Sequence, residues 1–540
     1  MLVGLGLRLR RAACLLGWAV ATVVIAPRAL ALTHSPGSAG SPSWTVYHDA
    51  PAGSGVAAGV GSVDTAARAW TSPTLDGQLY GEPLVLGDRV YVATENDTVY
   101  ALSAATGAIA WSAHLGTPVP SGLLPCGNIT PTVGITGTPV IDRARHEIFV
   151  VAGELTNGKP AHLLVGLNTA NGHRELSENV DPPGQAPAAI LQRTGLTLDD
   201  GRVYFGFGGN YGDCATYRGR LVSVPESGGT PHFFTVDAGP GESQGSIWMG
   251  GAAPAVDANG DLWVATGNGS VHSYRHAYDD SDGILEISPS MRLLQYFAPA
   301  NWPVNNADDL DMSTEPALLP DGQVIAAGKG QLVYLLDGTH LGGIGRQQAR
   351  LGQACGDNID GGNAVVGMTV YLPCLSGIIA VKATSSPPSL HLVWRSGVGG
   401  GPPIVAGGLV WTIGQNGQLY GLDPASGKIR QRATIGTPAN HFPTPGIGDG
   451  LLLAACAQNV IAFRTSAAGP SGAGASRAAT ATTQAARAGC HYTPPGPPIG
   501  RRFIAGIVLA CLVVIGAIGL FARLIRRQHR HRATAPEHHP

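Results

Sequence analysis

The chain has 540 residues, of which only 13% are charged, and its formal net charge is −2. So small a charge bias offers no extended basic surface, and we expect no nucleic-acid partner. The 77 glycines and 40 prolines exceed ordinary usage and favour a fold of many tight turns over one of long helices.

The N-terminal segment has the order of a secretory signal. Arg8, Arg10 and Arg11 precede an apolar run from Ala12 to Ala26, and the small-residue triplet Ala29-Leu30-Ala31 follows. The run is shorter than the roughly 20 residues that a membrane-spanning helix needs. We therefore expect residues 1–31 to be cleaved as a signal peptide; the alternative is a first span that stays in place.

Residues 32–465 repeat a unit of short β-forming segments separated by turn residues. The clearest copy occupies 81–111, and a second good copy occupies 402–429. Weaker copies lie at 138–176, 195–235, 250–298, 315–340, 362–396 and 443–464. Four strands every 40 residues or so predict an all-β fold, a β-propeller with eight blades.

The last copy is unfinished, because it stops after the segment Val460-Ile461-Ala462-Phe463. We expect Arg68-Ala69-Trp70 to supply its outer strand, which closes the ring and leaves no exposed edge. Seven blades remain the alternative, because insertions at 209–219 and 268–280 blur two boundaries.

The repeat closely resembles that of the pyrroloquinoline quinone (PQQ) enzymes, whose blades carry a Tyr-x-Leu strand, a Thr-Gly turn and a closing tryptophan. Here these are Tyr100-Ala101-Leu102, Thr106-Gly107 and Trp111, echoed by Tyr420-Gly421-Leu422 and Ser426-Gly427. The same repeat is found in quinoprotein dehydrogenases and in non-catalytic scaffolds similar to the assembly lipoprotein BamB. The resemblance therefore implies the fold and leaves the function open.

The dehydrogenases of this family imply a candidate site. In them a tryptophan ring forms the floor of the cofactor site, a glutamate and an asparagine bind a calcium ion, and an aspartate acts as the base. Trp248 and Asn268 resemble the floor and the asparagine ligand, and Asp309 and Asp311 lie at about the position of the base. Asn210 stands where the glutamate would be, and its neutral amide removes a charge that calcium needs.

Other interpretations of these candidate site residues stay open. The family's pair of adjacent cysteines has no counterpart here. Trp248 also suits blade packing, and the aspartates also suit an acidic surface turn. The acidic segments 210–213 and 278–282 lack the spacing of a known calcium loop and are expected to be solvated turns, so no separate metal site is predicted.

Six of the eight cysteines lie between the two hydrophobic ends of the chain: Cys126, Cys214, Cys355, Cys374, Cys456 and Cys490. An even number in an exported chain predicts three disulfides, although six cysteines permit fifteen pairings. Their placement favours Cys126 with Cys214, Cys355 with Cys374 and Cys456 with Cys490. Buried free thiols are the alternative.

The C-terminal part predicts a membrane anchor. Residues 466–502 form an Ala-, Gly- and Pro-rich stalk, residues 503–522 carry no charge, and five arginines follow in the tail, 523–540. Such a span is long enough to cross a bilayer, and its positive side stays in the cytosol. We expect a single-pass protein of the cell membrane with an extracytoplasmic propeller and a cytoplasmic C-terminus.

Two functions are compatible with this sequence. The first is a non-enzymatic, membrane-tethered propeller that binds a protein, peptide or envelope ligand on one face. The alternative is a PQQ- and calcium-dependent quinoprotein oxidoreductase acting on alcohols or sugars. The use of 30 arginines against 4 lysines indicates a GC-rich bacterium, of actinobacterial type.

Overall fold

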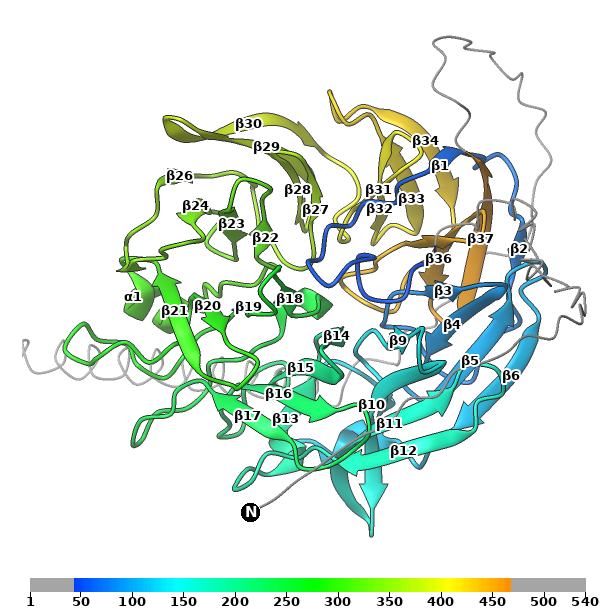
Figure 1. Ribbon diagram of the computed structural model, residues 1–540, viewed down its shortest axis with the longest axis horizontal. Coiled ribbons are helices and arrows are strands. Elements are labelled where there is room, and N and C mark those ends of the chain that lie inside the picture. Colours follow the sequence, from blue (N-terminus) through cyan, green and yellow to red (C-terminus); the bar gives the residue numbers. More distant parts are fainter. Residues whose placement is uncertain (1–42, 468–540) are drawn as a thin grey trace, which may run out of the picture. The chain divides into compact units, whose positions relative to one another are not determined.

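The computed structural model describes residues 43–467, which form eight antiparallel sheets arranged as the blades of a ring (Figure 1). This confirms the all-β, eight-bladed fold, and the seven-bladed alternative is wrong. The predicted signal peptide, the predicted membrane span, the tail and nearly all of the stalk lie outside the described residues. Among residues 43–467, no helix is long and apolar enough to cross a membrane.

Strands of the first three blades follow the chain order. Blade 1 contains β3 (Leu84–Leu86), β4 (Arg89–Ala93), β5 (Thr98–Ser103) and β6 (Ile109–His114). Blade 2 contains β9 (Val140–Asp142), β10 (Glu147–Thr156), β11 (Lys159–Asn168) and β12 (Arg174–Asn179). Blade 3 contains β13 (Ile190–Gln192), β14 (Thr197–Asp199), β15 (Arg202–Gly209), β16 (Arg220–Pro225) and β17 (His232–Thr235).

The next three blades contain the least regular part of the ring. Blade 4 contains β18 (Ala255–Val256), β19 (Leu262–Ala265), β20 (Ile284–Ile287) and β21 (Leu293–Ala298), with β25 (Gly343–Ile344) added in parallel to β21. Blade 5 contains β22 (Ala317–Leu318), β23 (Gln323–Ala327), β24 (Val333–Asp337) and β26 (Ala349–Leu351). Blade 6 contains β27 (Ala364–Val366), β28 (Thr369–Cys374), β29 (Gly377–Ser385) and β30 (Pro388–Ser396).

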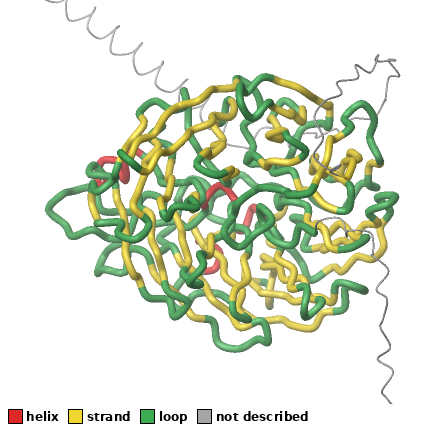
Figure 2. Tube along the Cα trace, turned by 45° about the horizontal axis from the view of Figure 1, so that its top comes forward, coloured by secondary structure: helices red, strands yellow, loops and turns green. Residues whose placement is uncertain are grey.

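Blade 7 contains β31 (Ile404–Ala406), β32 (Leu409–Gly414), β33 (Gln418–Leu422) and β34 (Ile429–Thr434). Blade 8 contains β35 (Gly446–Gly448), β36 (Leu451–Cys456) and β37 (Asn459–Ala467). A two-stranded ribbon, β7 (Val119–Pro120) with β8 (Thr132–Val133), stands apart from the blades. The few helical segments are short and lie in the connections (Figure 2): η1 (Ser121–Leu123), η2 (Pro187–Ala189), η3 (Met249–Gly251) and α1 (Trp302–Asp308).

Burial separates the middle strands from the outer ones. The middle strands β4, β5 and β36 are buried almost throughout, because neighbouring blades cover both of their faces. The outer strands β6, β12 and β34 instead alternate between exposed and half-buried residues. Continuous apolar runs in the middle and alternation at the rim are what this arrangement demands.

The ring closes through the N-terminal part of the chain, as the sequence predicts. Strand β2 (Trp70–Thr71) pairs antiparallel with β37, and β1 (Val60–Val63) pairs with the end of the same strand. Residues 60–71 and the last described strand therefore share one blade, and the outer edge of β37 is covered.

A repeated contact joins successive blades. The ring of Trp394, on β30, lies over the turn at Gly427, where an added Cβ would come within 2.5 Å of Trp394 Cε3. The indole Nε1 of Trp394 donates to the carbonyl oxygen of Pro424 in the same turn, at 2.9 Å. Trp70 packs in the same way on the turn of blade 1, and Trp111 on that of blade 2. The tryptophan of one blade and the Ser/Thr-Gly turn of the next blade thus form one inter-blade contact.

Residues 43–57 form an inner strap that runs across the middle of the ring, drawn in dark blue in Figure 1. Its backbone hydrogen-bonds to inner strands of five blades, through Val85, Ile141, Val256, Val365 and Val405. The buried carboxylate of Glu82 also holds the strap. Glu82 accepts from Trp44 Nε1 at 2.8 Å and from the His48 backbone N–H at 3.0 Å. Glu315 lies 3.9 Å from His48 Nδ1.

Two of the three predicted disulfides are present. Cys126 is joined to Cys214, and Cys355 to Cys374. The predicted partner of Cys456, Cys490, lies outside the described residues. For the four cysteines of the two observed bridges, the free-thiol alternative is wrong.

Candidate functional site

The candidate residues gather on one face of the ring. In a four-stranded blade, the connection that enters the first strand and the turn between the second and third strands lie on the same side, because the strands alternate in direction. We call this side the site face. Trp248 and Asp311 precede β18 and β22, whereas Asn268 and Lys329 follow β19 and β23. Blades 4 and 5 thus bring these residues together.

Asp311 is the centre of the group. Its side chain is 4% exposed, and its carboxylate oxygen Oδ2 lies 2.7 Å from Lys329 Nζ. The same oxygen accepts a hydrogen bond from Trp248 Nε1 at 3.2 Å. The other oxygen, Oδ1, accepts from the backbone N–H of Asn268 at 2.6 Å. For Asp311, the acidic surface turn considered from the sequence is therefore wrong.

Lys329 holds the group together electrostatically. Its Nζ lies 5.4 Å from the centroid of the Trp248 ring and also 2.8 Å from Asp309 Oδ1. Burial alone would lower the pKa of Lys329, but the carboxylates of Asp311 and Asp309 outweigh it and raise that pKa above its usual value. The ammonium group therefore stays charged at neutral pH.

Asp309 has a different place from Asp311. It follows α1 in the left-handed conformation, with φ 56°, and its side chain is 67% exposed. Asp309 thus ends the helix and supports Lys329 from the solvent side. Of the two candidate bases, only Asp311 is buried against the tryptophan.

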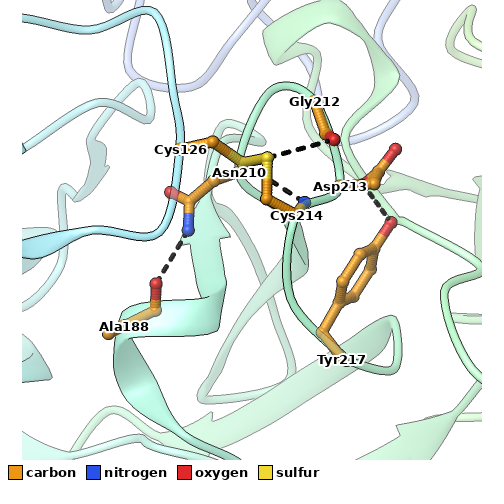
Figure 3. The surroundings of a disulfide bond; sticks show 7 residues. All are labelled: Cys126, Ala188, Asn210, Gly212, Asp213, Cys214 and Tyr217. Atoms are coloured by element: carbon orange, nitrogen blue, oxygen red, sulfur yellow. Dashed lines mark hydrogen bonds between the residues drawn. A yellow bond between two sulfur atoms is a disulfide. The ribbon is translucent and has the colours of Figure 1, made fainter.

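Asn210 lies in a neighbouring connection, beside the Cys126–Cys214 disulfide (Figure 3). Its amide Nδ2 donates to the carbonyl oxygen of Ala188 at 2.9 Å. Nearby, the Tyr217 hydroxyl donates to Asp213 Oδ1 at 2.8 Å. Burial raises the pKa of Asp213, the Tyr217 hydrogen bond opposes this, and the carboxylates of Asp311 and Asp309 add to the rise. This disulfide-bound loop therefore lies within electrostatic range of Asp311.

Arg193 is a cation on the site face that no sequence motif indicates. It is 9% exposed, and its Nη2 donates to Asn440 Oδ1 at 2.7 Å. Its guanidinium lies 5.6 Å from the Phe442 ring centroid, and Phe442 in turn lies 5.8 Å from Trp248. Within residues 43–467, no carboxylate comes within 4.0 Å of it. A nearly buried guanidinium with no carboxylate in ion-pair contact is suited to bind an anion.

The arrangement fits an anionic aromatic cofactor better than a calcium ion. The exposed part of the Trp248 ring offers a stacking surface, and Lys329 and Arg193 offer charges for carboxylates. The calcium donor set of Asn210, Asn268 and Asp311 contains a single carboxylate, and both of its oxygens already accept hydrogen bonds. Calcium prefers six to eight oxygen ligands with several charges among them. These residues do not fit that ion.

Comparisons with known proteins agree with the propeller fold. A family model described as outer membrane protein assembly factor BamB matches residues 56–277, which is less than half of the chain. Polyvinylalcohol dehydrogenase of Sphingopyxis sp. (strain 113P3) is 24% identical over 435 residues, which cover 67% of this chain and 62% of that protein. The chain thus spans less than two thirds of the length of this relative.

Solved structures with the same fold include quinoprotein enzymes. The quinohemoprotein alcohol dehydrogenase of Comamonas testosteroni superposes with a TM-score of 0.58 and 14% identity, covering 81% of this chain and 83% of that one. A europium-containing methanol dehydrogenase superposes with a TM-score of 0.57 and 14% identity, covering 78% and 98%. At such identities these structures show the fold alone. The chain is an eight-bladed β-propeller, and its residues 56–277 are similar to the family described as outer membrane protein assembly factor BamB.

Proposed function

We propose that the protein is a quinoprotein oxidoreductase that oxidises alcohol groups, the alternative that the sequence left open. The observation that carries this proposal is the contact of Asp311 with both Trp248 Nε1 and Lys329 Nζ. A non-catalytic scaffold has no need of a buried carboxylate that is paired with a lysine and contacts a half-buried tryptophan ring, as Asp311 does. The likeness to polyvinylalcohol dehydrogenase also supports the enzyme over the non-catalytic binding module.

PQQ is the proposed cofactor, and when bound it supplies a quinone that accepts a hydride from the substrate carbon. It is a planar compound with three carboxylates. Trp248 offers it a ring face, while Lys329 and Arg193 offer it cations. Stacking and charge pairing are each strong in a partly dehydrated site.

Asp311 has the chemistry of the base. An ionised carboxylate takes the hydroxyl proton of an alcohol as the hydride leaves the carbon, so the products are a carbonyl compound and a protonated Asp311. The Lys329 ammonium lies against Asp311, and the Trp248 indole N–H and the Asn268 backbone N–H fix the two carboxylate oxygens. Because the donor set does not fit calcium, we derive no step through a metal ion.

The test uses the full-length chain, purified in mild detergent and incubated with PQQ, with and without Ca²⁺. We expect stoichiometric PQQ binding, followed by quinone absorbance, and dye reduction with primary, secondary or polymeric alcohols. Asp311→Asn should lower dye reduction by about 100-fold or more and leave PQQ binding within a few-fold of the wild type. Trp248→Ala should weaken PQQ binding.

Asp200→Asn is the matched control, since Asp200 is exposed in the turn between β14 and β15, where its φ of 43° suits asparagine. Its activity should equal that of the wild type. Absence of binding at micromolar PQQ, or full activity of Asp311→Asn, would overturn the proposal and leave the non-catalytic binding module.

We further propose an extracytoplasmic location, with the protein held in the cell membrane by residues 503–522. Two disulfides in the described domain support an oxidising compartment. Protease treatment of intact cells tests this location. It should release a soluble fragment that contains the propeller, whereas full protection of the chain would contradict it.

A further inference from the structure

Aspartates from two site-face connections meet beside the Asn268 loop. Asp237 follows β17, and Asp279, Asp280 and Asp282 precede β20. The backbone N–H of Asp237 donates to the carbonyl oxygen of Asp279 at 3.0 Å, which fixes the two connections side by side. Asp237 is 0% exposed and Asp279 is 4% exposed. The solvated turn expected for residues 278–282 is therefore wrong.

Several of these buried oxygens have no hydrogen-bond partner. Both carboxylate oxygens of Asp237 are unpaired, and so is Asp279 Oδ2. Asp279 Oδ1 accepts from the hydroxyl and the backbone N–H of Ser281, at 2.6 and 3.2 Å. Buried polar atoms almost always have partners, because an unpaired one costs about 1–3 kcal/mol or more. Three such oxygens on two connections that are joined through their backbones leave room for a ligand to complete the group.

The charges around these oxygens are strongly unbalanced. Burial raises the pKa of Asp237 to about 9, and Asp279, Glu242 and Asp280 add to the rise. Arg218 is the cation that opposes it, but its guanidinium donates to the carbonyl oxygens of Gly239 and Glu242. A positively charged partner would offset this imbalance.

A second buried acidic group shows the contrast. Glu95, Asp97 and Glu154 also carry unpaired oxygens on the site face. In that group, however, the positive charge of Arg193 acts on Glu95, and that of Arg174 acts on Glu154. Cations of the chain thus act on two of those three carboxylates, whereas in the Asp237 group Arg218 acts on Asp237 alone.

We propose that Asp237, Asp279 and Asp280 bind a divalent cation of the calcium type, at a site separate from Asp311. All the ligand atoms on offer are oxygens, which suits a hard cation and disfavours zinc. The cation would tie residues 237–245 to residues 268–282. Since the Gly245 N–H donates to the Asn268 carbonyl oxygen at 2.9 Å, and the Asn268 N–H donates to Asp311, this tie also positions the candidate base.

The site needs a small adjustment to bind. Among residues 43–467, the sets of three potential ligand atoms that lie within 4.8 Å of one another do not include Asp237. At least one side chain must therefore rotate, and we expect a dissociation constant in the range of extracellular calcium modules, about 10⁻⁴–10⁻³ M.

Terbium is a suitable probe, because aromatic side chains lie next to the carboxylates. Burial raises the pKa of Tyr278, and Asp280, Asp279 and Asp282 add to the rise, so its ring is close to them. Tyr278 stacks on Tyr296 at 4.6 Å. With the full-length chain and no PQQ, Tb³⁺ should give saturable emission on excitation of tyrosine, and Ca²⁺ should displace it.

Asp237→Asn and Asp279→Asn should each weaken Tb³⁺ binding by about tenfold or more and abolish the rise in melting temperature on adding Ca²⁺. Because asparagine is neutral and nearly isosteric with aspartate, we expect both variants to fold. A cooperative melting transition in EDTA checks this. Asp261→Asn is the matched control, since Asp257, Asp261 and Glu286 form another acidic group, at turns of the opposite face.

Asp311→Asn separates this site from the candidate active site and should keep the Tb³⁺ emission. Absence of saturable emission from the wild type, or unchanged binding by Asp237→Asn and Asp279→Asn, would overturn the inference. Emission lost only in Asp311→Asn would also overturn it, because the cation would then lie at the proposed active site. These outcomes are independent of whether PQQ binds.

Discussion

Asp97 shows at the scale of one residue how the ring buries charge. It lies in the turn between β4 and β5, is 0% exposed, and neither carboxylate oxygen has a hydrogen-bond partner. Burial raises its pKa to about 9, and Glu154, Glu95 and Asp76 add to the rise. Other charges act on its neighbours: Arg193 on Glu95, and Arg174 and His114 on Glu154.

Asp97 therefore predicts a stability that depends on pH. An unfolded aspartate loses its proton near pH 4, whereas folded Asp97 keeps it to about pH 9. Between these values the folded chain binds more protons than the unfolded chain, so stability falls as pH rises, by at most about 1.4 kcal/mol per pH unit from this group. Asp97→Asn should flatten the fall, because the amide does not titrate and suits the positive φ of 52°.

Denaturant unfolding at pH 5, 7 and 9 measures the effect. The gain in stability from Asp97→Asn should grow with pH, whereas Asp200→Asn, at an exposed turn, should give no such trend. Parallel pH profiles for the wild type and Asp97→Asn would show that the carboxyl is not protonated in the folded chain.

Single residues also show where sequence reasoning succeeds. Trp248 and Asp311 are recognisable because they lie at positions that resemble those of the family's cofactor-contacting tryptophan and base. Arg193 and Asn440 are not, since they are 247 positions apart and meet only because the ring brings blades 3 and 8 close. Lys329 carries one usable signal, as one of 4 lysines in the chain and at the turn after a second strand.

At the scale of elements, the repeat motif is a contact between blades. The closing tryptophan of one blade lies on the glycine turn of the next, and for this reason both are conspicuous in the sequence. The strand pattern predicts the middle strands well, because they are continuously apolar. It misplaces the end of blade 5, where the expected copy ends at 340 but β26 lies at Ala349–Leu351. That short strand has no buried residue and so carries no apolar signal.

Gly427→Ala tests the inter-blade contact. Gly427 has a φ of 67°, and an added Cβ would meet the Trp394 ring. Left-handed backbone costs a residue with a Cβ about 1–2 kcal/mol, and the clash adds about 1–3 kcal/mol. Thermal or denaturant unfolding should therefore show a loss of about 2–5 kcal/mol.

Gly408→Ala is the control for this prediction. Gly408 lies in the same blade with a φ of 76°, and nothing is within 4 Å of an added Cβ. It should lose only the backbone part, about 1–2 kcal/mol. Equal losses at the two positions would mean that the tryptophan contact contributes nothing.

At the scale of the whole molecule, the closure of the ring is predictable and the inner strap is not. The unfinished last repeat leaves an edge that something must cover, and Trp70 lies in a segment that fits it. Residues 43–57 carry no strand pattern, because they hydrogen-bond to one inner strand after another instead of forming a strand of their own.

The strap predicts cooperative unfolding. It bonds to five blades, so no blade on its path can separate without breaking it. Tryptophan fluorescence and far-UV circular dichroism should therefore give one coincident transition in denaturant. Glu82→Ala, which removes the acceptor for Trp44 and His48, should lower the midpoint of both signals together. An early separate transition in one signal would indicate blades that unfold singly.

Strand β37 has a consequence for the order in which the domain is completed. The ribosome makes residues 60–71 long before residues 459–467, yet these two segments form one blade. The strands in residues 60–71 therefore have no strand to pair with until nearly the whole domain has been synthesised. A chain that ends before β37 is consequently not a smaller propeller: it is an open ring with β36 exposed along one edge, ready to pair with another chain.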